Sequence, residues 1–415
     1  MRVELITVGD ELLLGYTIDT NGAFLGRELA AVGVELVRRT SVGDGAEAIA
    51  GAVREALDRT GAVITTGGLG PTSDDRTKPA VAALFGRAMR LDDEIARALE
   101  ARWKARGWPG PLPVANRQQA MIPDGAEILT NRHGSAPGIW LEDDAGRWVA
   151  MLPGVPREAR GMTVDTLVPR LRERLGAAAG VVRSLTIRTT GIAESAVADR
   201  LAELAGGIDG LALAYLPGPD GLDLRLTSRG TGGDAADAAL VAAAAKLRER
   251  IGTYVYGGGD DDLAALVLER CRARGLRIAV AESCTGGMLG ARLTAVPGSS
   301  DVFDGGIIAY SNEVKRAQLG VTAADLAAHG AVSEPVVRAM TTGVRERFGA
   351  GVGIAITGVA GPGGGTPEKP VGTVWVAGDV AGAVTARRLS LIGDREEIRR
   401  RATQAALDLV RRSLD

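Results

Sequence analysis

A serine in the last third of the chain is the first residue whose position suggests chemistry. Residues 277–281 are predicted to form a strand, and Ser283 follows this strand just before Gly286 and Gly287. Glycines let a substrate approach the backbone closely, and a helix predicted near 285–294 would offer N–H groups to an anion or oxyanion. The pattern indicates a nucleophilic hydroxyl, although a serine here is also typical of an ordinary helix cap.

A serine nucleophile needs a base, and the chain offers few candidates. His133 and His329 are its only histidines, and the sequence around His329 is typical of the end of a helix. A desolvated lysine of lowered pKa is the other route. Lys315 follows a strand predicted at 305–310, where α/β sheets bind ligands, although an isolated lysine is usually a surface residue. Cys284 is a rival nucleophile, since a helix N-terminus lowers a thiol pKa, but it lacks a partner histidine.

Glycine-rich segments after two other predicted strands suggest phosphate binding. Residues 358–365 follow the strand 352–357, and their amides could cradle a phosphate, although a surface turn has the same composition. Paired aspartates after a glycine loop can hold a hard cation such as Mg²⁺, which engages a pyrophosphate with few protein ligands. Such a segment follows the strand 62–66 and contains Gly67, Gly68, Gly70, Thr72, Asp74 and Asp75.

The acidic part of that segment has a simpler alternative. Asp75 or Ser73 could cap a helix over 77–85 and hold no metal. A second strand predicted at 3–8 also ends where such sheets bind ligands, in Gly9, Asp10 and Glu11.

Strands that alternate with helices must position these residues in residues 1–176. The strands 3–8, 34–37 and 62–66 alternate with helices, which implies a mostly parallel sheet covered on both faces. A hairpin of 138–142 with 147–152 is predicted to follow, and then a helix near 157–174.

The rest of the chain is predicted to form two more domains. The strand–helix–strand–strand–helix order of residues 177–256 predicts a small α+β domain, and residues 257–415 return to an α/β pattern. Linkers are predicted at 177–180 and 257–260. The last helix, 394–413, is rich in Arg and Glu, and we expect a solvated face with salt bridges.

Composition excludes several classes of function. The net charge of −2 does not favour nucleic acid or anionic lipid as a partner, and two histidines nearly exclude a multi-histidine zinc site. Two cysteines form no disulfide framework, which is typical of a reducing compartment. No apolar run approaches about 20 residues, and no signal peptide is visible at the start, so we expect a soluble cytoplasmic protein.

Five ordered motifs after residue 260 resemble the CinA C-terminal domain, the nicotinamide mononucleotide amidohydrolase family. They are Ala281–Gly287, Tyr310–Lys315, His329–Pro335, Thr357–Pro362 and Lys369–Trp375. The resemblance implies a Ser–Lys catalytic pair, with Ser283 as nucleophile and Lys315 as base. It implies a substrate pocket lined by Thr285, Gly286, Tyr310, Asn312, Thr357, Gly358 and Gly361.

The first 170 residues resemble the MoaB/MogA-like molybdopterin-binding domain as it occurs in CinA proteins. The resemblance rests on the segments near Gly9 and Gly67 and on residues 153–158. It implies an ADP-ribose pyrophosphatase with a divalent metal (Mg or Co type) at Asp74 and Asp75. The nucleotide site that it implies consists of Gly9, Asp10, Glu11, Gly67, Gly68, Gly70 and Thr72. Fold identity fixes no substrate, however.

The middle domain resembles the KH-type module of the same proteins. KH modules clamp nucleic acid with a G-x-x-G loop, and residues 207–210 fit that pattern formally. This loop carries an aspartate and no neighbouring Lys or Arg, so we predict a turn and a structural spacer.

The resulting expectation is a homodimeric bifunctional enzyme of pyridine-nucleotide recycling. It would act on nicotinamide mononucleotide without a cofactor and on ADP-ribose with a metal. Two alternatives stay open: a deamidase whose N-terminal domain only binds nucleotides, and a competence or DNA-damage accessory protein without enzymatic activity.

Overall fold

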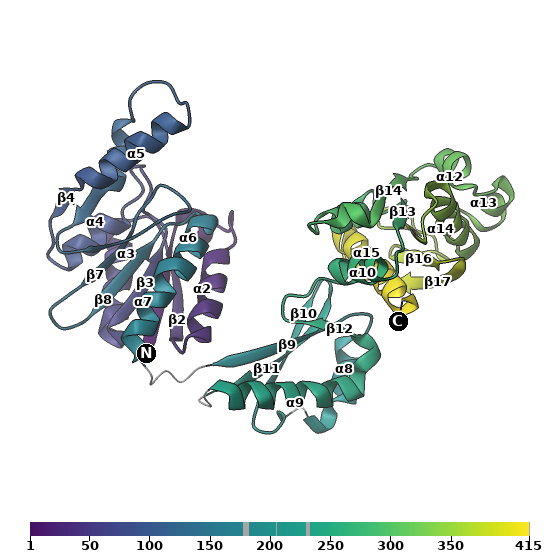
Figure 1. Ribbon diagram of the computed structural model, residues 1–415, viewed down its shortest axis with the longest axis horizontal. Helices are drawn as coiled ribbons and strands as arrows, with labels where there is room; N and C mark the ends of the chain where they lie inside the picture. The colour runs from purple at the N-terminus through teal and green to yellow at the C-terminus, as the bar shows by residue number, and fades with distance from the viewer. Residues whose placement is uncertain (177–181, 205, 230–232, 415) are drawn as a thin grey trace. The chain divides into compact units, whose positions relative to one another are not determined.

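The computed structural model describes residues 1–176, 182–204, 206–229 and 233–414 (Figure 1). The chain divides into two compact units. The first comprises residues 1–183 and 229–237, and the second comprises 184–228 and 238–415. The linker predicted at 177–180 lies outside the described residues.

A six-stranded sheet forms the centre of the first unit. β1 pairs in parallel with β2 and β3, and β3 pairs in parallel with β8, whereas β7 pairs antiparallel with β8 and β6. The predicted parallel-sheet domain is confirmed, and the predicted hairpin is formed by β7 and β8, with the antiparallel strand β6 beyond it at the edge. The strand order is β2 (Glu35–Val42), β1 (Arg2–Val8), β3 (Ala62–Thr66), β8 (Trp148–Leu152), β7 (Gly138–Glu142) and β6 (Glu127–Leu129).

Successive side chains of a buried strand point to opposite faces, so this sheet has two cores. Val3 and Leu5 of β1 belong to one core, and Ile6 and Val8 belong to the other. The first core is covered by α2 (Thr20–Ala31), α6 (Pro156–Met162) and α7 (Val168–Leu175), and the second by α3 (Ala46–Thr60) and α4 (Thr77–Leu84). Residues 163–167 form a π-helical turn between α6 and α7 within the predicted helix 157–174.

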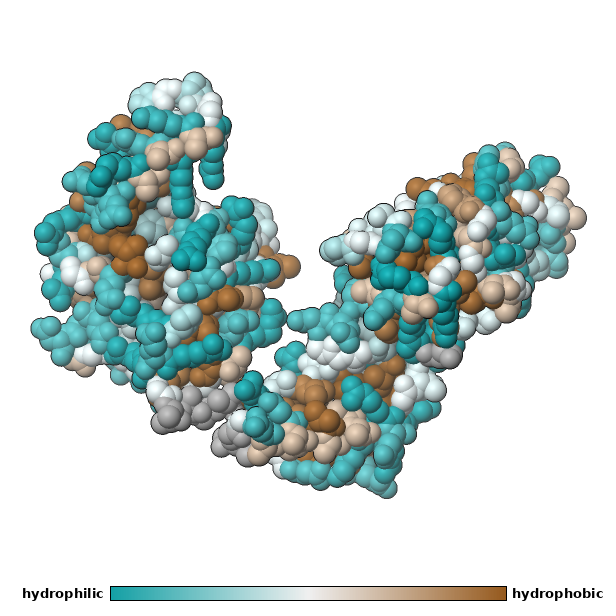
Figure 2. Space-filling model, viewed as in Figure 1, coloured by the Kyte–Doolittle hydropathy of each residue, from teal (hydrophilic) through white to brown (hydrophobic). Residues whose placement is uncertain are grey.

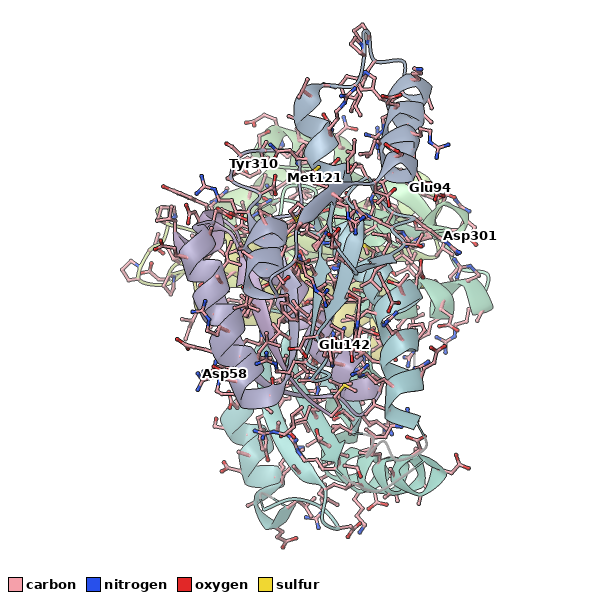
Figure 3. The ribbon with its side chains drawn as sticks, turned by 90° about the vertical axis from the view of Figure 1, so that its left-hand side faces the viewer. Asp58, Glu94, Met121, Glu142, Asp301 and Tyr310 are labelled. Carbon is pink, nitrogen blue, oxygen red and sulfur yellow. The ribbon has the colours of Figure 1, made fainter. Side chains whose placement is uncertain are left out.

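The segment between α4 and β6 forms elements that the sequence analysis does not predict. Its main helix, α5 (Asp93–Ala105), is capped by the Asp92 side chain and buries only Leu99. Figure 3 marks the segment at Glu94 of α5 and at Met121 of β5. The other elements are β4 (Met89–Leu91), the 3₁₀ helix η1 (Val114–Ala120) and β5 (Met121–Pro123).

A four-stranded sheet covered by two helices forms the first part of the second unit. Leu222, Leu224 and Leu226 of β11 are buried against α8 (Glu194–Arg200) and α9 (Gly233–Ile251), as their alternation predicts. The strand order is β10 (Ala212–Gly218), β11 (Gly221–Ser228), β9 (Arg183–Thr189) and β12 (Val255–Gly258).

The formal G-x-x-G segment of this domain is a tight turn, as predicted. Ile208 bridges to Leu211 across the turn, and Asp209 has a left-handed φ of 52°. The Asp209 carboxylate accepts hydrogen bonds from Lys246 Nζ at 2.8 and 3.0 Å. The cation nearest the turn therefore already has a carboxylate partner.

The prediction of a flexible linker at 257–260 is wrong. Gly257 and Gly258 belong to β12 and pair antiparallel with β9, and the N–H of Gly259 donates to the Thr186 carbonyl at 2.9 Å. Tyr256 is buried in the hydrophobic core of the following α/β domain. Glycine is compatible with a strand where another backbone approaches closely, so a glycine run is not by itself a flexible segment.

The C-terminal α/β domain is built on a five-stranded sheet. β13 pairs in parallel with β14 and β15, so the carboxyl ends of these three strands meet at one edge. The strand order is β14 (Phe303–Ile308), β13 (Ile278–Glu282), β15 (Val352–Gly358), β16 (Thr373–Val380) and β17 (Ala383–Ser390). One face is covered by α10 (Leu263–Ala273), α11 (Met288–Thr294) and α15 (Arg395–Ser413), and the other by α12 (Asn312–Leu319) and α14 (Glu334–Phe348).

Candidate active sites

Ser283 lies directly beyond the carboxyl end of the central strand β13. Its N–H donates to the Ile356 carbonyl at 2.9 Å, and the Glu282 carbonyl accepts from the Ala309 N–H at 2.7 Å. Both neighbouring strands therefore hold the residue, which is 9% exposed. Gly286 and Gly287 have φ values of 59° and 98°, which bend the chain away before α11 begins.

Glu282 anchors the turn that follows the serine. Its carboxylate is 1% exposed and accepts hydrogen bonds from the N–H groups of Gly287, Leu289 and Gly290 at 2.8–3.1 Å. These amides belong to the start of α11. The prediction that this helix N-terminus would receive a substrate anion is therefore wrong, because the Glu282 side chain occupies it.

Lys315 and Ser283 are brought together although 32 residues separate them. Lys315 lies in the first turn of α12, is 1% exposed, and places its Nζ 3.1 Å from the Ser283 Oγ. The same nitrogen donates to the carbonyls of Ala309 at 2.7 Å and Tyr310 at 3.2 Å. Burial lowers the pKa of Lys315 below the ordinary lysine value.

The partners of this nitrogen leave room for the neutral amine to act as a base, and burial favours that form. The two carbonyls can only accept, so they use the two N–H bonds of a neutral amine, and its lone pair is left for the serine hydroxyl. A charged ammonium would instead donate to the Ser283 oxygen and could not take its proton. The geometry therefore suits Lys315 as a base for Ser283.

Cys284, the rival nucleophile, faces the hydrophobic core. It is 6% exposed and packs with the apolar side chains of α10, α11 and α15. Burial raises the pKa of its thiol to about 11, so the thiolate is scarce near neutral pH. The structure favours Ser283 over Cys284 as the nucleophile.

Two of the predicted pocket residues share an arginine. Tyr310, labelled in Figure 3, is exposed, and its hydroxyl accepts from Arg395 Nη2 at 3.2 Å. Arg395 Nη1 donates to the Gly361 carbonyl at 2.6 Å. This arginine therefore links the end of β14 to the loop after β15.

The other predicted pocket residues differ in their contacts and in their exposure. The Thr357 hydroxyl donates to the Ala331 carbonyl at 2.9 Å, and Asn312 is an exposed first residue of α12. A Cβ at Gly358 would come within 2.9 Å of the Thr373 carbonyl, so strand packing explains this glycine. Thr285 is fully buried, and within the described structure its hydroxyl has no hydrogen-bond partner.

The sequence analysis missed two arginines at the start of α15, where it predicted a solvated face. In addition to Arg395, Arg399 donates from Nη2 to the Thr285 carbonyl at 2.6 Å, and its buried Nε has no partner among the described residues. Residues four apart lie on one helix face, so this spacing could have indicated a paired cationic site. The capping box of Asp394 and Glu397 fixes where the helix starts.

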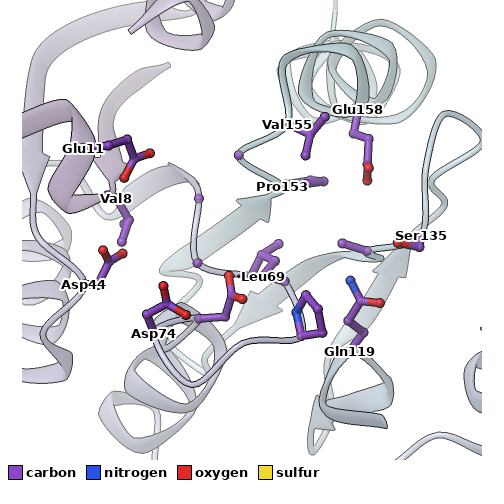
Figure 4. Close-up of a pocket in the computed structure, with 18 residues that line it drawn as sticks. Val8, Glu11, Asp44, Leu69, Asp74, Gln119, Ser135, Pro153, Val155 and Glu158 are labelled. Carbon is purple, nitrogen blue, oxygen red and sulfur yellow. Dashed lines mark hydrogen bonds between the residues drawn. The ribbon is translucent and has the colours of Figure 1, made fainter. Parts of the chain in front are cut away.

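A second candidate site is a cavity of about 430 Å³ at the carboxyl ends of β1, β3 and β8 (Figure 4). Most of the predicted nucleotide-site and metal-site residues line it: Gly9, Glu11, Gly67, Gly68, Gly70, Asp74 and Asp75. The sequence analysis missed four polar residues of the lining because they come from distant segments: Asp44, Gln119, Ser135 and Glu158.

Asp10 and Thr72 do not line this cavity, contrary to the prediction. The Asp10 carboxylate accepts from the Asp44 N–H at 3.3 Å and ties the end of β1 to the end of β2. The Thr72 hydroxyl donates to the Asp75 carboxylate at 2.5 Å. Both side chains hold neighbouring backbone in place.

The glycine loop after β3 is folded by close contacts. A Cβ at Gly67 would come within 2.2 Å of the Val8 carbonyl, and both Gly67 and Gly68 have left-handed φ values. The Asp75 carboxylate accepts from the N–H groups of Gly70 at 2.7 Å and Thr72 at 2.8 Å. Asp75 therefore stabilises the loop, and the alternative that it caps α4 is wrong.

The carboxylates here fit a cation that is shared with a ligand. Within the described ranges, no three His, Cys, Asp or Glu side chains are grouped to hold a metal ion. Mg²⁺ keeps several waters and needs only one or two carboxylates when substrate phosphates supply the rest. Asp74 is exposed and lines the cavity, whereas Asp75 is engaged in the hydrogen bonds of the loop, so Asp74 suits this role better than Asp75.

In the part of the chain that the structure describes, no helix has the length and apolar character needed to cross a membrane. The face shown in Figure 2 is mainly hydrophilic.

Comparison with known proteins places each part of the chain in a family. Residues 4–173 match the "Probable molybdopterin binding domain", 184–257 match the "Damage-inducible protein CinA KH domain", and 260–414 match the "CinA C-terminal domain". A CinA-like protein from Gemmatimonas aurantiaca is 66% identical over 413 residues, with 100% of this chain and 96% of the relative covered. A CinA-like protein from Desulfovibrio desulfuricans is 43% identical over 417 residues, with 100% and 96% covered. A crystal structure of a CinA superfamily protein from Klebsiella pneumoniae is 41% identical over 37% of this chain and 95% of that chain, with a TM-score of 0.36.

Proposed function

The chain belongs to the CinA family, and we propose that its C-terminal domain deamidates nicotinamide mononucleotide through Ser283 and Lys315. The observation that carries the proposal is the 3.1 Å contact between the Lys315 Nζ and the Ser283 Oγ, with two carbonyls on the same nitrogen. This arrangement keeps the lysine oriented toward the hydroxyl, and burial favours its neutral form.

The first half of the reaction forms an ester. The neutral Lys315 takes the proton of the Ser283 hydroxyl while the oxygen attacks the carboxamide carbon. The tetrahedral intermediate collapses as the C–N bond breaks, and the lysine ammonium gives its proton to the departing nitrogen. Ammonia leaves, and the nicotinoyl group is held on the Ser283 oxygen.

The second half releases nicotinate mononucleotide. The again neutral Lys315 takes a proton from a water molecule, whose oxygen attacks the ester carbon. The bond to the Ser283 oxygen breaks, and the lysine returns the proton to that oxygen. Neither half requires a cofactor, since the pair supplies both the nucleophile and the proton carrier.

The arginines of α15 support a phosphorylated substrate. Arg395 and Arg399 present guanidinium groups on one helix face, next to Tyr310 and Thr285. Guanidinium groups bind phosphate oxygens by charge-assisted hydrogen bonds. We assign the phosphate of the nucleotide to these two arginines, and the unpartnered hydroxyl of Thr285 to a polar group of the substrate.

Ammonia release from nicotinamide mononucleotide tests this proposal. Ser283→Ala should abolish it, since no other group takes over the covalent step. Ser299→Ala is the matched control, because Ser299 is also buried but lies at the opposite end of α11. An active Ser283→Ala variant together with an inactive Cys284→Ala variant would assign the reaction to the thiol.

For the N-terminal domain, we propose a metal-dependent ADP-ribose pyrophosphatase. The supporting observation is a cavity where the left-handed glycines Gly67 and Gly68 face the carboxylates of Glu11 and Asp74. Here the loop would hold the pyrophosphate, and Asp74 would hold a divalent cation, which neutralises phosphate charge.

Incubation with ADP-ribose and Mg²⁺ or Co²⁺ tests this second activity. We expect AMP and ribose phosphate, and no reaction after a chelator is added. If ADP-ribose binds but is not cleaved, the domain is a nucleotide-binding module. If neither nucleotide is bound or cleaved by the chain, the accessory-protein alternative is favoured.

A further inference from the structure

Gln119 is the buried side chain of the N-terminal cavity that lacks a partner. It is 3% exposed and lines the cavity, yet within the described structure its Oε1 accepts no hydrogen bond. Figure 4 shows its amide turned toward the cavity, on the side away from Glu11 and Asp44. A buried carbonyl oxygen without a donor costs free energy, so a ligand N–H at this point would be favourable.

The backbone that carries Gln119 is held firmly. Lys78 of α4 donates from Nζ to the carbonyls of Gln118 at 2.7 Å and Gln119 at 3.0 Å. Lys78 is 3% exposed, and burial lowers its pKa to about 8. Because α4 directly follows the glycine loop, this contact fixes the distance between the amide of Gln119 and the loop proposed to hold the pyrophosphate.

The polar lining divides chemically between the two sides of the cavity. The carboxylates of Glu11 and Asp74 can only accept hydrogen bonds, which suits a cation and its phosphates. The carboxylates of Asp44, Asp75 and Glu158 already accept hydrogen bonds from the Asp10 N–H, the glycine loop and Asn131. Gln119 differs, because its planar amide presents a donor and an acceptor side by side.

A planar amide of this kind is complementary to the edge of adenine. The exocyclic amino group of adenine donates to the amide oxygen, and the adjacent ring nitrogen accepts from the amide N–H. The ribose-phosphate end of a nucleotide offers no such planar pair. The ligand group opposite Gln119 should therefore be the base.

We propose that Gln119 is the residue that selects adenine in the N-terminal cavity. The orientation of the nucleotide in this proposal rests on the proposed pyrophosphatase function. The pyrophosphate lies against the Gly67–Gly70 loop and the cation at Asp74, and the base extends to Gln119. This assigns base specificity to a residue outside the glycine loops.

The test uses the full chain and combines a substitution of Gln119 with a substrate analogue that has a changed base. ADP-ribose is compared with its analogue in which purine, lacking the amino group, replaces adenine. Wild type should prefer ADP-ribose by about tenfold in kcat/KM, which is the effect of losing one arm of a bidentate contact. Gln119→Met, which keeps the volume, should remove the preference, and it should slow ADP-ribose hydrolysis more than hydrolysis of the analogue, since ADP-ribose loses both contacts to the amide and the analogue loses only the one at its ring nitrogen.

A binding arm separates the failure of this proposal from the failure of the proposed function. The Kd values of ADP and of purine riboside diphosphate are measured by calorimetry with Mg²⁺ present. If ADP-ribose is not hydrolysed but ADP still binds tighter than the analogue, and Gln119→Met loses this difference, the base contact stands and only the pyrophosphatase fails. Equal affinities for wild type, an unchanged preference in Gln119→Met, or no binding of either nucleotide would each overturn it.

Discussion

Replacement of Lys315 by methionine is the sharpest test of the C-terminal site. Methionine keeps most of the buried volume of the lysine stem but removes the nitrogen that contacts the Ser283 Oγ at 3.1 Å. The Ala309 and Tyr310 carbonyls lose their donor at the same time. The serine hydroxyl then has no base within hydrogen-bond distance.

The expected loss is large because one group performs both proton transfers. A positioned general base contributes about 10²–10⁴-fold, so we expect kcat for ammonia release to fall by at least about 10²-fold. Lys246→Met is the matched control. Lys246 is exposed in the middle domain and pairs with Asp209, so its loss should leave the rate within about twofold.

The pH dependence of kcat/KM in the wild-type enzyme tests whether Lys315 acts as the base. Only the neutral Lys315 accepts the serine proton, so kcat/KM should rise with pH as the ammonium deprotonates, and then level off. Because burial lowers the pKa of this lysine, the levelling should occur below about 10.4, the value of a free lysine side chain. A soluble Lys315→Met variant that keeps the wild-type rate or the same rising limb would refute the Ser–Lys pair.

Three further outcomes follow from the geometry. Glu282→Gln should lower kcat more than it raises KM, since it weakens the contacts that hold the turn after the nucleophile. Circular dichroism should show an unchanged fold, and an unchanged kcat would contradict this role. Asp74→Asn should abolish metal-dependent ADP-ribose hydrolysis at moderate metal concentration, and the activity should recover with more metal. Asp75→Asn should instead lower the melting temperature of the first unit. Identical behaviour of the two variants would contradict the assignment of metal binding to Asp74 and of loop stability to Asp75. A fragment of residues 184–415 should fold and deamidate nicotinamide mononucleotide, whereas one of 261–415 should be less stable by thermal melting; equal stability would mean that the middle domain contributes nothing to the core.

The parts of the fold that alternate regularly could be predicted from the sequence. Strands such as β3 and β15 are largely apolar, buried runs that end in glycine-rich turns, and α14 has a regular apolar stripe, with Pro335 in its first turn and a left-handed Gly349 at its end. The sequence analysis missed the helix α5, although Asp92 caps its start and Ile95, Leu99 and Trp103 recur every four residues along it. Only Leu99 of this stripe is buried, and charged residues surround it in the sequence.

The candidate sites could be predicted only where their residues follow strands. Ser283 and Gly67 come directly after central strands, and sheet geometry brings such residues to one edge. Gln119 and Arg399 reach their sites from a 3₁₀ helix and from the last helix of the chain, whose sequences resemble ordinary polar surface. Their roles depend on packing between distant segments, which spacing along the chain does not encode.

The glycine run at 257–260 shows why composition alone misplaces a boundary. Close neighbours leave little room for side chains at two of these glycines: a Cβ at Gly258 would stand 3.1 Å from the Thr186 carbonyl, and a Cβ at Gly257 would stand 2.6 Å from the Asp261 carboxylate. Two residues earlier, Tyr256 inserts into the core beneath β13, and the Asp261 carbonyl accepts from Arg188 of β9 at 2.6 Å. Cutting the chain here would remove a strand from one sheet and an aromatic side chain from the core under the other. A fragment from residue 184 onward therefore keeps both of these contacts, whereas a fragment that begins at residue 261 loses them.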